Sequence, residues 1–370
     1  MPELLKNYFN RPFLEDFAGT VTAVVPHFDK QQFLHQIFDE HWDQRELKQR
    51  MRHIAIALHD GLSGSYDKDI AAIIQIIRHI QQKGKKEFGI EYMFLPDYIE
   101  VYGLDHLESS QRAMEFITQF TSCEFAVRPF IKKYPEAMMA KMLAWSAHPH
   151  HFVRRFASEG CRPRLPWAMA LPALKKDPAP IIPILENLKN DPSEFVRRSV
   201  ANNLNDISKD NPDLVMQIVN RWQGSSRETD WIIKHGCRTL LRKAHDHTLS
   251  VFGFSSAVLC EIANLSVEPP QIRIGDALHF SFQLISKEKQ PVKYRVEYAV
   301  DFVKSNGKHS RKLFKITENT FQPNTPYPFK RTQRFHDLTT RKHYPGKHQL
   351  GILINGNELA KLPFTLLEQE

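Results

Sequence analysis

The stretch HPHHFVRRFASEGCRPRLPW, residues 148–167, decides the fold, because most of it returns in altered form 43 positions later as DPSEFVRRSVANNLND, residues 191–206. A repeat of that length is typical of stacked helix pairs rather than of one compact core. Helical spacing puts the apolar residues of each copy on one face. The residues predicted to be buried are Val153, Phe156, Ala157 and Cys161 in the first copy, and Val196, Val200 and Leu204 in the second.

The opposite helical face of the first copy carries charge. Arg155, Glu159 and Arg162 share it at i, i+4 and i+7 spacing, so we expect one carboxylate among arginines on a solvent-facing side. The second copy keeps the basic pair, as Arg197 and Arg198, and has Asn202 in the place of Glu159. The apolar and basic positions are therefore repeated, whereas the glutamate occurs in the first copy alone. This is expected if one copy of the repeat carries a functional site.

Helical segments follow one another in pairs from about residue 108, with prolines at the joints, and residues 1–105 are also mostly helical. This pattern predicts an α-solenoid of HEAT-like repeats over residues 1–256. In the second helix of each pair an apolar residue precedes a basic one, and equivalent helices of a solenoid lie side by side. We therefore expect a stripe of cations on one face, from the pairs Val127-Arg128, Val153-Arg154, Val196-Arg197 and Ile233-Lys234.

The period changes to two after about residue 256. In VKYRVEY, residues 292–298, and in LHFSFQL, residues 278–284, an apolar residue fills every second place. Asn306-Gly307 and Asn355-Gly356 are strong signals of tight hairpins. Residues 257–370 are thus predicted to form an all-β sandwich of immunoglobulin-like architecture.

The charge of the chain favours a polyanionic partner. The net charge is +8 and the isoelectric point is near 9.2, and a basic surface gains affinity by displacing counterions from phosphates. Residues 257–370 hold 17 Lys and Arg against 11 Asp and Glu, a net +6 of that total. The sequence shows neither a signal peptide nor an apolar run long enough to span a membrane, so we expect a cytoplasmic protein. No coiled coil calls for more than a monomer.

Several kinds of chemistry lack support. The cysteines contain no CxxC pair, which argues against a zinc ribbon or an iron–sulfur cluster. His148, His150 and His151 have no carboxylate or thiol at ligand spacing. The chain has no Walker loop and no GxGxxG, GxSxG or HExxH motif. We therefore expect neither a metal nor a cofactor.

Three residues are candidates for a site, and each also has a plain structural interpretation. Glu159, one turn from Arg155 and one from Arg162, is also explained as a surface salt bridge. Glu124 stands at the start of a predicted helix, where an acid interacts favourably with the helix dipole. Trp167 lies in a proline-bounded loop, where a tryptophan is more often there for packing than for binding a ligand.

Four segments carry a family resemblance. CEFAVRPFI, ASEGCRPRLPW, EFVRRSVANNLNDISKDNPD and WIIKHGCRTLL resemble the repeats of the AlkC branch of the AlkC/AlkD alkylpurine DNA glycosylases. The similarity spans roughly residues 1–255, and its most specific part is ASEGCRPRLPW. The β domain resembles the immunoglobulin-like module found in some AlkC members.

The resemblance implies a DNA glycosylase of base excision repair that removes cationic N3-methylated bases from duplex DNA, chiefly 3-methyladenine, with 3-methylcytosine as a second candidate. Glu159 would stabilise charge and activate water, Glu124 would be its partner, and Trp167 would lay its π face against the deoxyribose. The residues expected to bind DNA are Arg154, Arg155, Arg162, Arg164, Arg197, Arg198, Asn202, Lys234 and Arg238.

The AlkD-type scaffold further implies attack from outside the base stack, without flipping the base, although the sequence leaves this open. Two other functions also remain open. One is a non-catalytic HEAT-repeat adaptor that binds nucleic acid or an acidic protein surface through the same cations. The other is a lesion-sensing binder that has lost activity. The presence of both Glu124 and Glu159, with Trp167 nearby, argues against the second.

Overall fold

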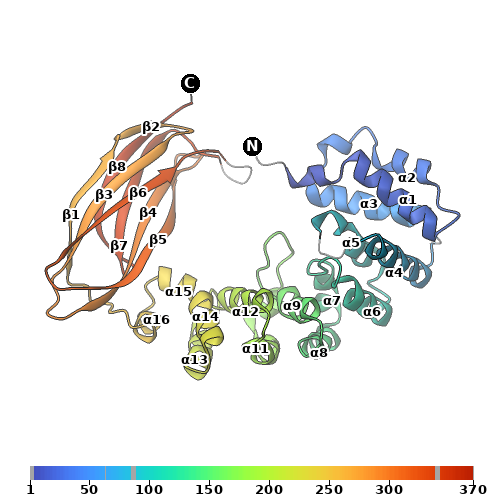
Figure 1. Ribbon diagram of the computed structural model, residues 1–370, viewed down its shortest axis with the longest axis horizontal. Coiled ribbons are helices and arrows are strands. Elements are labelled where there is room, and N and C mark those ends of the chain that lie inside the picture. The colour runs from blue at the N-terminus through green and yellow to red at the C-terminus, as the bar shows by residue number, and fades with distance from the viewer. Residues whose placement is uncertain (1–3, 63, 85–88, 338–341, 370) are drawn as a thin grey trace. The chain divides into compact units, whose positions relative to one another are not determined.

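The computed structural model describes residues 4–62, 64–84, 89–337 and 342–369. The chain divides into two compact units, one formed by Met1–Val215 with Trp222–Gly236, and the other by Met216–Arg221 with Cys237–Glu370. The first unit is helical and the second contains all the described strands (Figure 1). The predicted fold class, HEAT-like helical repeats followed by an immunoglobulin-like β-sandwich, is confirmed. The domain boundary at residues 256 and 257 stays a prediction.

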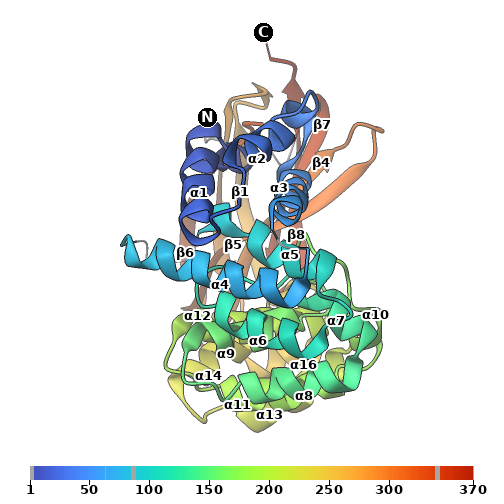
Figure 2. The same ribbon diagram turned by 90° about the vertical axis from the view of Figure 1, so that its right-hand side faces the viewer.

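The helices of the first unit follow one another in chain order (Figures 1 and 2). The α-helices are α1 (Arg11–Val24), α2 (Lys30–Ile37), α3 (Leu47–Gly61), α4 (Tyr66–Gln82), α5 (Phe94–Tyr102), α6 (Leu107–Ile117), α7 (Val127–Lys133), α8 (Pro135–Trp145), α9 (His151–Gly160), α10 (Pro172–Lys176), α11 (Ile182–Leu188), α12 (Glu194–Ile207) and α14 (Arg227–Gly236). Helix α13 (Pro212–Trp222) contributes to both units. Short 3₁₀ turns are η1 (Leu5–Tyr8), η2 (Trp42–Gln44), η3 (Ile90–Tyr92) and η4 (Ala179–Ile181).

Helices α9 and α12 are the two copies of the repeat and lie side by side (Figures 1 and 2). The predicted apolar stripes are confirmed, since each of these side chains is fully buried: Val153, Phe156, Ala157, Cys161, Val196, Val200 and Leu204. The end of α9 also approaches the preceding pair closely. A Cβ atom at Gly160 would lie 2.7 Å from Met142 Cε and 2.8 Å from Val127 Cγ1. Glycine at this position therefore lets the end of α9, which carries Glu159, approach α7 and α8.

The segment WIIKHGCRTLL, residues 231–241, forms two helices rather than one. Helix α14 ends at Gly236, and α15 (Arg238–Arg242) begins after Cys237, whose φ and ψ of −83° and 4° are not helical. Helix α14 also packs close to α12, because a Cβ atom at Gly236 would lie 2.9 Å from Leu204 Cβ.

Besides its part of α13, the second unit contains α15 and α16 (Asp246–Val251), followed by the strands. These are β1 (Cys260–Glu268), β2 (Gln271–Arg273), β3 (Ala277–Ser286), β4 (Val292–Val303), β5 (His309–Phe321), β6 (Pro326–Arg334), β7 (Gly346–Ile354) and β8 (Asn357–Leu367). One sheet has the order β1-β3-β6 and the other β2-β8-β7-β4-β5. Asn355 and Gly356 join β7 to β8 with φ of 50° and 85°, the left-handed pair that a type I′ hairpin needs.

Strand β4 departs from simple alternation. Tyr294 and Val296 face the sandwich core as expected, but the intervening Arg295 is also buried, with 4% exposure. Arg295 pairs with Glu297 at 2.7 Å and with Glu318, so its buried charge has carboxylate partners on the other face of the sheet. Within the described ranges, no helix is both long and apolar enough to cross a membrane.

Candidate active site

Two acids from different helix pairs meet at one arginine. Glu124 lies in the turn that precedes α7, and Glu159 lies in the last turn of α9. Arg155, one turn before Glu159, forms an ion pair with Glu124 Oε2 and lies 3.6 Å from Glu159 Oε1. Its guanidinium also stacks over the ring of Phe195, 4.9 Å from the ring centroid. The arrangement brings the two predicted catalytic carboxylates together through a shared cation.

Glu159 uses both carboxylate oxygens. Its Oε1 accepts a hydrogen bond of 2.6 Å from Arg162 Nη1, and its Oε2 accepts one of 2.6 Å from Ser199 Oγ. The Ser199 oxygen in turn lies 3.0 Å from Ser158 Oγ. A serine hydroxyl has a single hydrogen, so Ser199 donates to Glu159 and is left to accept from Ser158. Residues of α9 and α12 thus fix the carboxylate from both sides.

The prediction that Glu159 faces solvent is wrong. The residue is only 6% exposed, because α12 covers this face of α9 and Ser199 projects onto it. Burial alone would raise the pKa of Glu159, but the charges of Arg155 and Arg162 and the Ser199 hydrogen bond outweigh it and lower the pKa below its ordinary value of 4.5. Glu159 is therefore a buried carboxylate that stays ionised.

The line of charges continues beyond Glu159. Arg162, 6% exposed, donates from Nε to Asp206 Oδ2 at 2.9 Å, and Lys209 Nζ lies 2.9 Å from Asp206 Oδ1. Acids and bases consequently alternate along the sequence of contacts Glu124, Arg155, Glu159, Arg162, Asp206 and Lys209. Each arginine in this line has two carboxylate neighbours, which offsets the free energy of removing it from water.

Glu124 differs from Glu159 in having an open oxygen. Its Oε2 binds Arg155 and accepts a 2.7 Å hydrogen bond from Ser122 Oγ. Its Oε1 has no partner among the residues that the structure describes. The side chain is 14% exposed, so this oxygen is accessible to water.

Trp167 lies in the segment between α9 and α10 and has an unusual backbone. Its φ is 63°, in the left-handed region that bulky residues rarely adopt, and the residue is 59% exposed. Its carbonyl oxygen accepts a 2.9 Å hydrogen bond from Lys48 Nζ at the start of α3. The backbone is therefore held in a strained form that presents a large aromatic ring to solvent, a combination typical of functional sites.

The predicted stripe of cations differs from the structure. Arg128 is fully buried, and Arg154 uses its guanidinium within the protein, with Nε at 2.5 Å and Nη2 at 3.0 Å from the Asp191 carboxylate. Arg154 and Arg197 also make the same loop contact, each donating from Nη1 to two backbone carbonyls that precede its own helix. The acceptors are His148 and Pro149 for Arg154, and Asp191 and Pro192 for Arg197.

Arg164 and Arg198 are the predicted DNA-binding arginines that are most exposed. Arg164 pairs with Asp210 at 2.6 Å, and Arg198 pairs with Glu194 at 2.7 Å in an exposed i, i+4 arrangement. Asn202 and Lys234 are half-buried in the first unit, and the half-buried Arg238 belongs to the second. Contact between DNA and any of the nine predicted residues stays a prediction.

Sequence reasoning missed three polar residues of the site: Ser122, Ser199 and Asp206. A signal for Ser199 was present, because it stands 43 positions after Phe156 and so places a hydroxyl in the apolar stripe of the second copy. A polar residue at a repeated core position needs a buried partner, and Glu159 is that partner. Ser122 and Asp206 have no comparable signal in the repeat.

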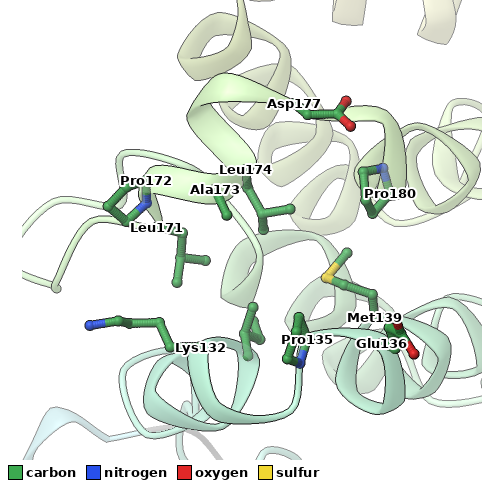
Figure 3. A pocket seen from close by; sticks show the side chains of 11 residues that line it. Lys132, Pro135, Glu136, Met139, Leu171, Pro172, Ala173, Leu174, Asp177 and Pro180 are labelled. Carbon is green, nitrogen blue, oxygen red and sulfur yellow. The ribbon is translucent and has the colours of Figure 1, made fainter.

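The described part of the chain holds no group of three or more His, Cys, Asp or Glu side chains placed to bind a metal ion. A cavity of about 660 Å³ lies beside α10 (Figure 3). Its lining is mostly apolar, as Leu171, Leu174 and Met139 illustrate, and it includes neither predicted catalytic carboxylate. The carboxylates and Trp167 thus lie outside this cavity.

Comparison with known proteins places this chain in a family. Residues 30–244 match the family described as DNA alkylation repair enzyme, and residues 261–368 match the C-terminal Ig-like domain of the uncharacterised protein YhaZ. YhaZ of Bacillus subtilis (strain 168) is 44% identical over 360 residues, which cover 97% of this chain and 98% of the relative.

A solved structure is similar over the whole length. The Pseudomonas fluorescens alkylpurine DNA glycosylase AlkC, bound to DNA containing an abasic site analog, matches with a TM-score of 0.90 at 35% identity. The match covers 99% of this chain and 100% of that one. The helical part and the immunoglobulin-like part thus each match a family, and both relatives match the whole chain. The chain belongs to the family of DNA alkylation repair enzymes.

Proposed function

We propose that the protein is a DNA glycosylase that hydrolyses the N-glycosidic bond of cationic N3-methylated bases in duplex DNA, with 3-methyladenine as the main substrate and 3-methylcytosine as a second. The observation that carries the proposal is the pair of carboxylates joined by Arg155, one buried and ionised and the other with an accessible oxygen. The similarity to a protein named as an alkylpurine DNA glycosylase supports it.

The chemistry of the substrate fits this pair. A base methylated at N3 carries a positive charge and leaves as a neutral molecule when the bond to C1′ breaks and its electron pair moves to the base. The deoxyribose then develops oxocarbenium character, and water adds to C1′ and loses a proton. The enzyme therefore needs negative charge near the sugar and an acceptor for that proton, and it does not need a strong acid for the base.

The two carboxylates suit different parts of this task. The sequence-based expectation gives water activation to Glu159, but both of its oxygens are occupied. We therefore assign to Glu124, which has the free oxygen, the roles of orienting water and accepting its proton. Glu159 has both oxygens occupied, so it contributes a fixed negative charge and holds Arg155 and Arg162 in place. Trp167 supplies an exposed π face that suits contact with an electron-poor sugar.

We further propose that the base is removed without being flipped into a pocket. Glu124 and Trp167 are reached from the surface, and the cavity beside α10 is lined by neither. An enzyme that flips its base normally encloses it in a fitted pocket. Attack from the side of the sugar requires only access to C1′. The enzyme then discriminates by reactivity, because the positive charge of a methylated base already weakens its N-glycosidic bond.

Release of free base from alkylated duplex DNA tests the proposal directly. Methylated DNA is incubated with the protein, and released bases are separated by chromatography and identified by mass spectrometry. We expect free 3-methyladenine above the spontaneous background. Tight binding to the same DNA without release above that background would instead support a non-catalytic adaptor.

The rate of base release is expected to change little with pH between about pH 5.5 and pH 8. The leaving base is already charged and needs no proton. The lowered pKa of Glu159 keeps that carboxylate ionised down to below its ordinary value of 4.5. Single-turnover rate constants measured across this range test the expectation. A rate that rises steadily as the pH falls would mean that base protonation limits the reaction.

The sandwich carries most of the net charge, and we expect its basic residues to contribute to DNA binding. Lys330, Arg331 and Arg334 are exposed on β6. Replacing all three by glutamine should weaken binding and lower the slope of log Kd against log salt concentration by about 0.9 for each lost phosphate contact. Fluorescence anisotropy titrations at several salt concentrations measure this slope. An unchanged slope would mean that these residues only keep the sandwich soluble.

Point substitutions are preferable here to a chain cut after residue 256. The segment before that residue is bound to the sandwich, since Lys293 Nζ donates to Phe252 O at 2.9 Å and Asn355 Nδ2 donates to Ser255 O at 2.8 Å. A shortened chain would lose these contacts together with the charges, and the two effects would be mixed.

A further inference from the structure

The segment between α9 and α10 is held through its backbone. It runs from the end of the helix that carries Glu159 to Trp167 and on to Leu171, whose N–H donates to Pro163 O at 3.2 Å. Trp167, with its left-handed φ of 63°, is the most strained residue in it. A bulky residue persists in this conformation only when its surroundings hold it there.

Arg128 makes most of the hydrogen bonds that fix the backbone of this segment. Its Nε donates to Met169 O at 2.6 Å, and its Nη1 donates to Gly160 O at 3.0 Å and to Arg162 O at 2.9 Å. One guanidinium thereby joins both ends of the segment. A planar fork with several N–H groups in fixed directions can satisfy three carbonyls together, whereas the single ammonium of a lysine is a point charge with a different geometry.

The charge of Arg128 is not explained by an ion pair. The side chain is fully buried, its Nη2 has no hydrogen-bond partner, and the described residues place no carboxylate at ion-pair distance from it. Burial lowers the pKa of Arg128 to about 10. A neutral apolar residue would avoid this unfavourable burial, so the contacts to the segment account for an arginine at this position.

Lys48, from a distant part of the chain, also fixes the backbone of this segment. It is exposed at the start of α3, and its Nζ donates to the carbonyl of Trp167 itself at 2.9 Å. The same ammonium lies over the ring of Phe125, 4.9 Å from its centroid, next to Glu124. Lys48 thus connects the strained backbone of Trp167 to the turn that bears Glu124.

We infer that Arg128 and Lys48 are positioning residues that fix the Trp167 indole against the sugar of the damaged nucleotide. The inference rests on the proposed glycosylase function. Neither residue needs to touch DNA for this role, because each acts on backbone carbonyls of the segment. Without them the segment relaxes, the φ of Trp167 returns to a common value, and the ring moves away from its site. Misplacement by about 1 Å is enough to slow a reaction by roughly 100-fold.

The test uses the full chain labelled with 5-fluorotryptophan, with the ¹⁹F resonance of Trp167 identified by its absence in Trp167→Phe. Lys48→Met is the main variant, since Lys48 is exposed and its loss does not threaten the fold. Lys68→Met, at an exposed position of α4, is the matched control. Arg128→Lys and Lys48→Arg complete the set. Each variant is also assayed for DNA affinity and for single-turnover base release.

In Lys48→Met and Arg128→Lys we expect the Trp167 resonance to move or broaden while the other tryptophans stay in place. The rate constant should fall about tenfold in Lys48→Met and about 100-fold in Arg128→Lys, with DNA affinity unchanged. Lys48→Arg should recover the resonance and the rate, because its guanidinium still donates to the carbonyl, and Lys68→Met should behave as wild type.

Two results would overturn the inference. One is a Trp167 resonance that stays in place in both Lys48→Met and Arg128→Lys, and this result does not depend on any activity. The other is a resonance that moves while the rate of base release stays at the wild-type value. Failure of the wild-type protein to release base would instead reject the proposed function, and the resonance would still show whether the two cations hold Trp167.

Discussion

Replacing Glu159 by glutamine should lower the single-turnover rate constant of base release by about 100-fold to 1,000-fold, the usual effect of removing one preorganised electrostatic partner of a transition state. The substitution preserves shape, since the amide oxygen can accept from Arg162 and the amide nitrogen can donate to Ser199. What disappears is the charge that opposes the developing cation on the sugar.

The fold and the DNA affinity of the Glu159→Gln protein should persist. Breaking a buried ion pair normally leaves an uncompensated charge, but here Arg155 keeps Glu124 and Arg162 keeps Asp206. Thermal unfolding and anisotropy titrations check both points. Glu194→Gln is the matched control, since it removes a glutamate that pairs with an arginine at i+4 on an exposed surface. Near wild-type excision by Glu159→Gln would falsify its catalytic assignment.

The fold was predictable where one physical pattern repeats. The apolar spacing of the two copies around Val153 and Val196 predicts both buried faces, and the structure confirms them. The change to alternation after residue 256 likewise predicts the sandwich, and the Asn355-Gly356 hairpin follows from the need for two residues with positive φ. These patterns depend on neighbours within one element, which a sequence displays directly.

The environment of Glu159 depends on a neighbouring helix and was not predictable in the same way. Helical spacing places Glu159 opposite the apolar stripe of α9, which reads as a solvent-facing side. The structure buries it because α12 brings Ser199 onto that side, and Arg162 folds back from the following turn. The sequence of a single helix shows which of its faces is polar. It does not show whether the polar face of a neighbouring helix covers that face.

The Val-Arg pairs show the same limit for cations. Arg128, Arg154 and Arg197 follow a valine in equivalent sequence positions, yet none forms part of a simple exposed stripe. Arg128 joins the two ends of the segment bearing Trp167, and the other two tie the turns that precede their own helices. An arginine offers five donors to backbone carbonyls as readily as to phosphates, and the dipeptide does not distinguish the two uses.

The second large effect is expected at Glu124, whose replacement by alanine should lower the rate of base release by about 100-fold or more, within the range of general-base catalysis. Unlike Glu159, Glu124 combines an oxygen without a partner in the described structure with 14% side-chain exposure. The loss therefore removes the acceptor of the proton of water, and also leaves Arg155 with Glu159 as its remaining carboxylate.

Chemical rescue of the alanine variants by an added carboxylate distinguishes a glutamate that acts as a general base from one that only balances the charge of an arginine. Formate added to Glu124→Ala should restore part of the rate, because a small carboxylate can enter the accessible space that Glu124 leaves and accept the same proton. Formate should not restore Glu159→Ala, because Ser199, Arg155 and Arg162 enclose that position, which is 6% exposed in the native protein. Rescue of neither variant, with both proteins folded, would assign Glu124 to holding Arg155 rather than to activating water. Rescue of Glu159→Ala alone would exchange the two roles.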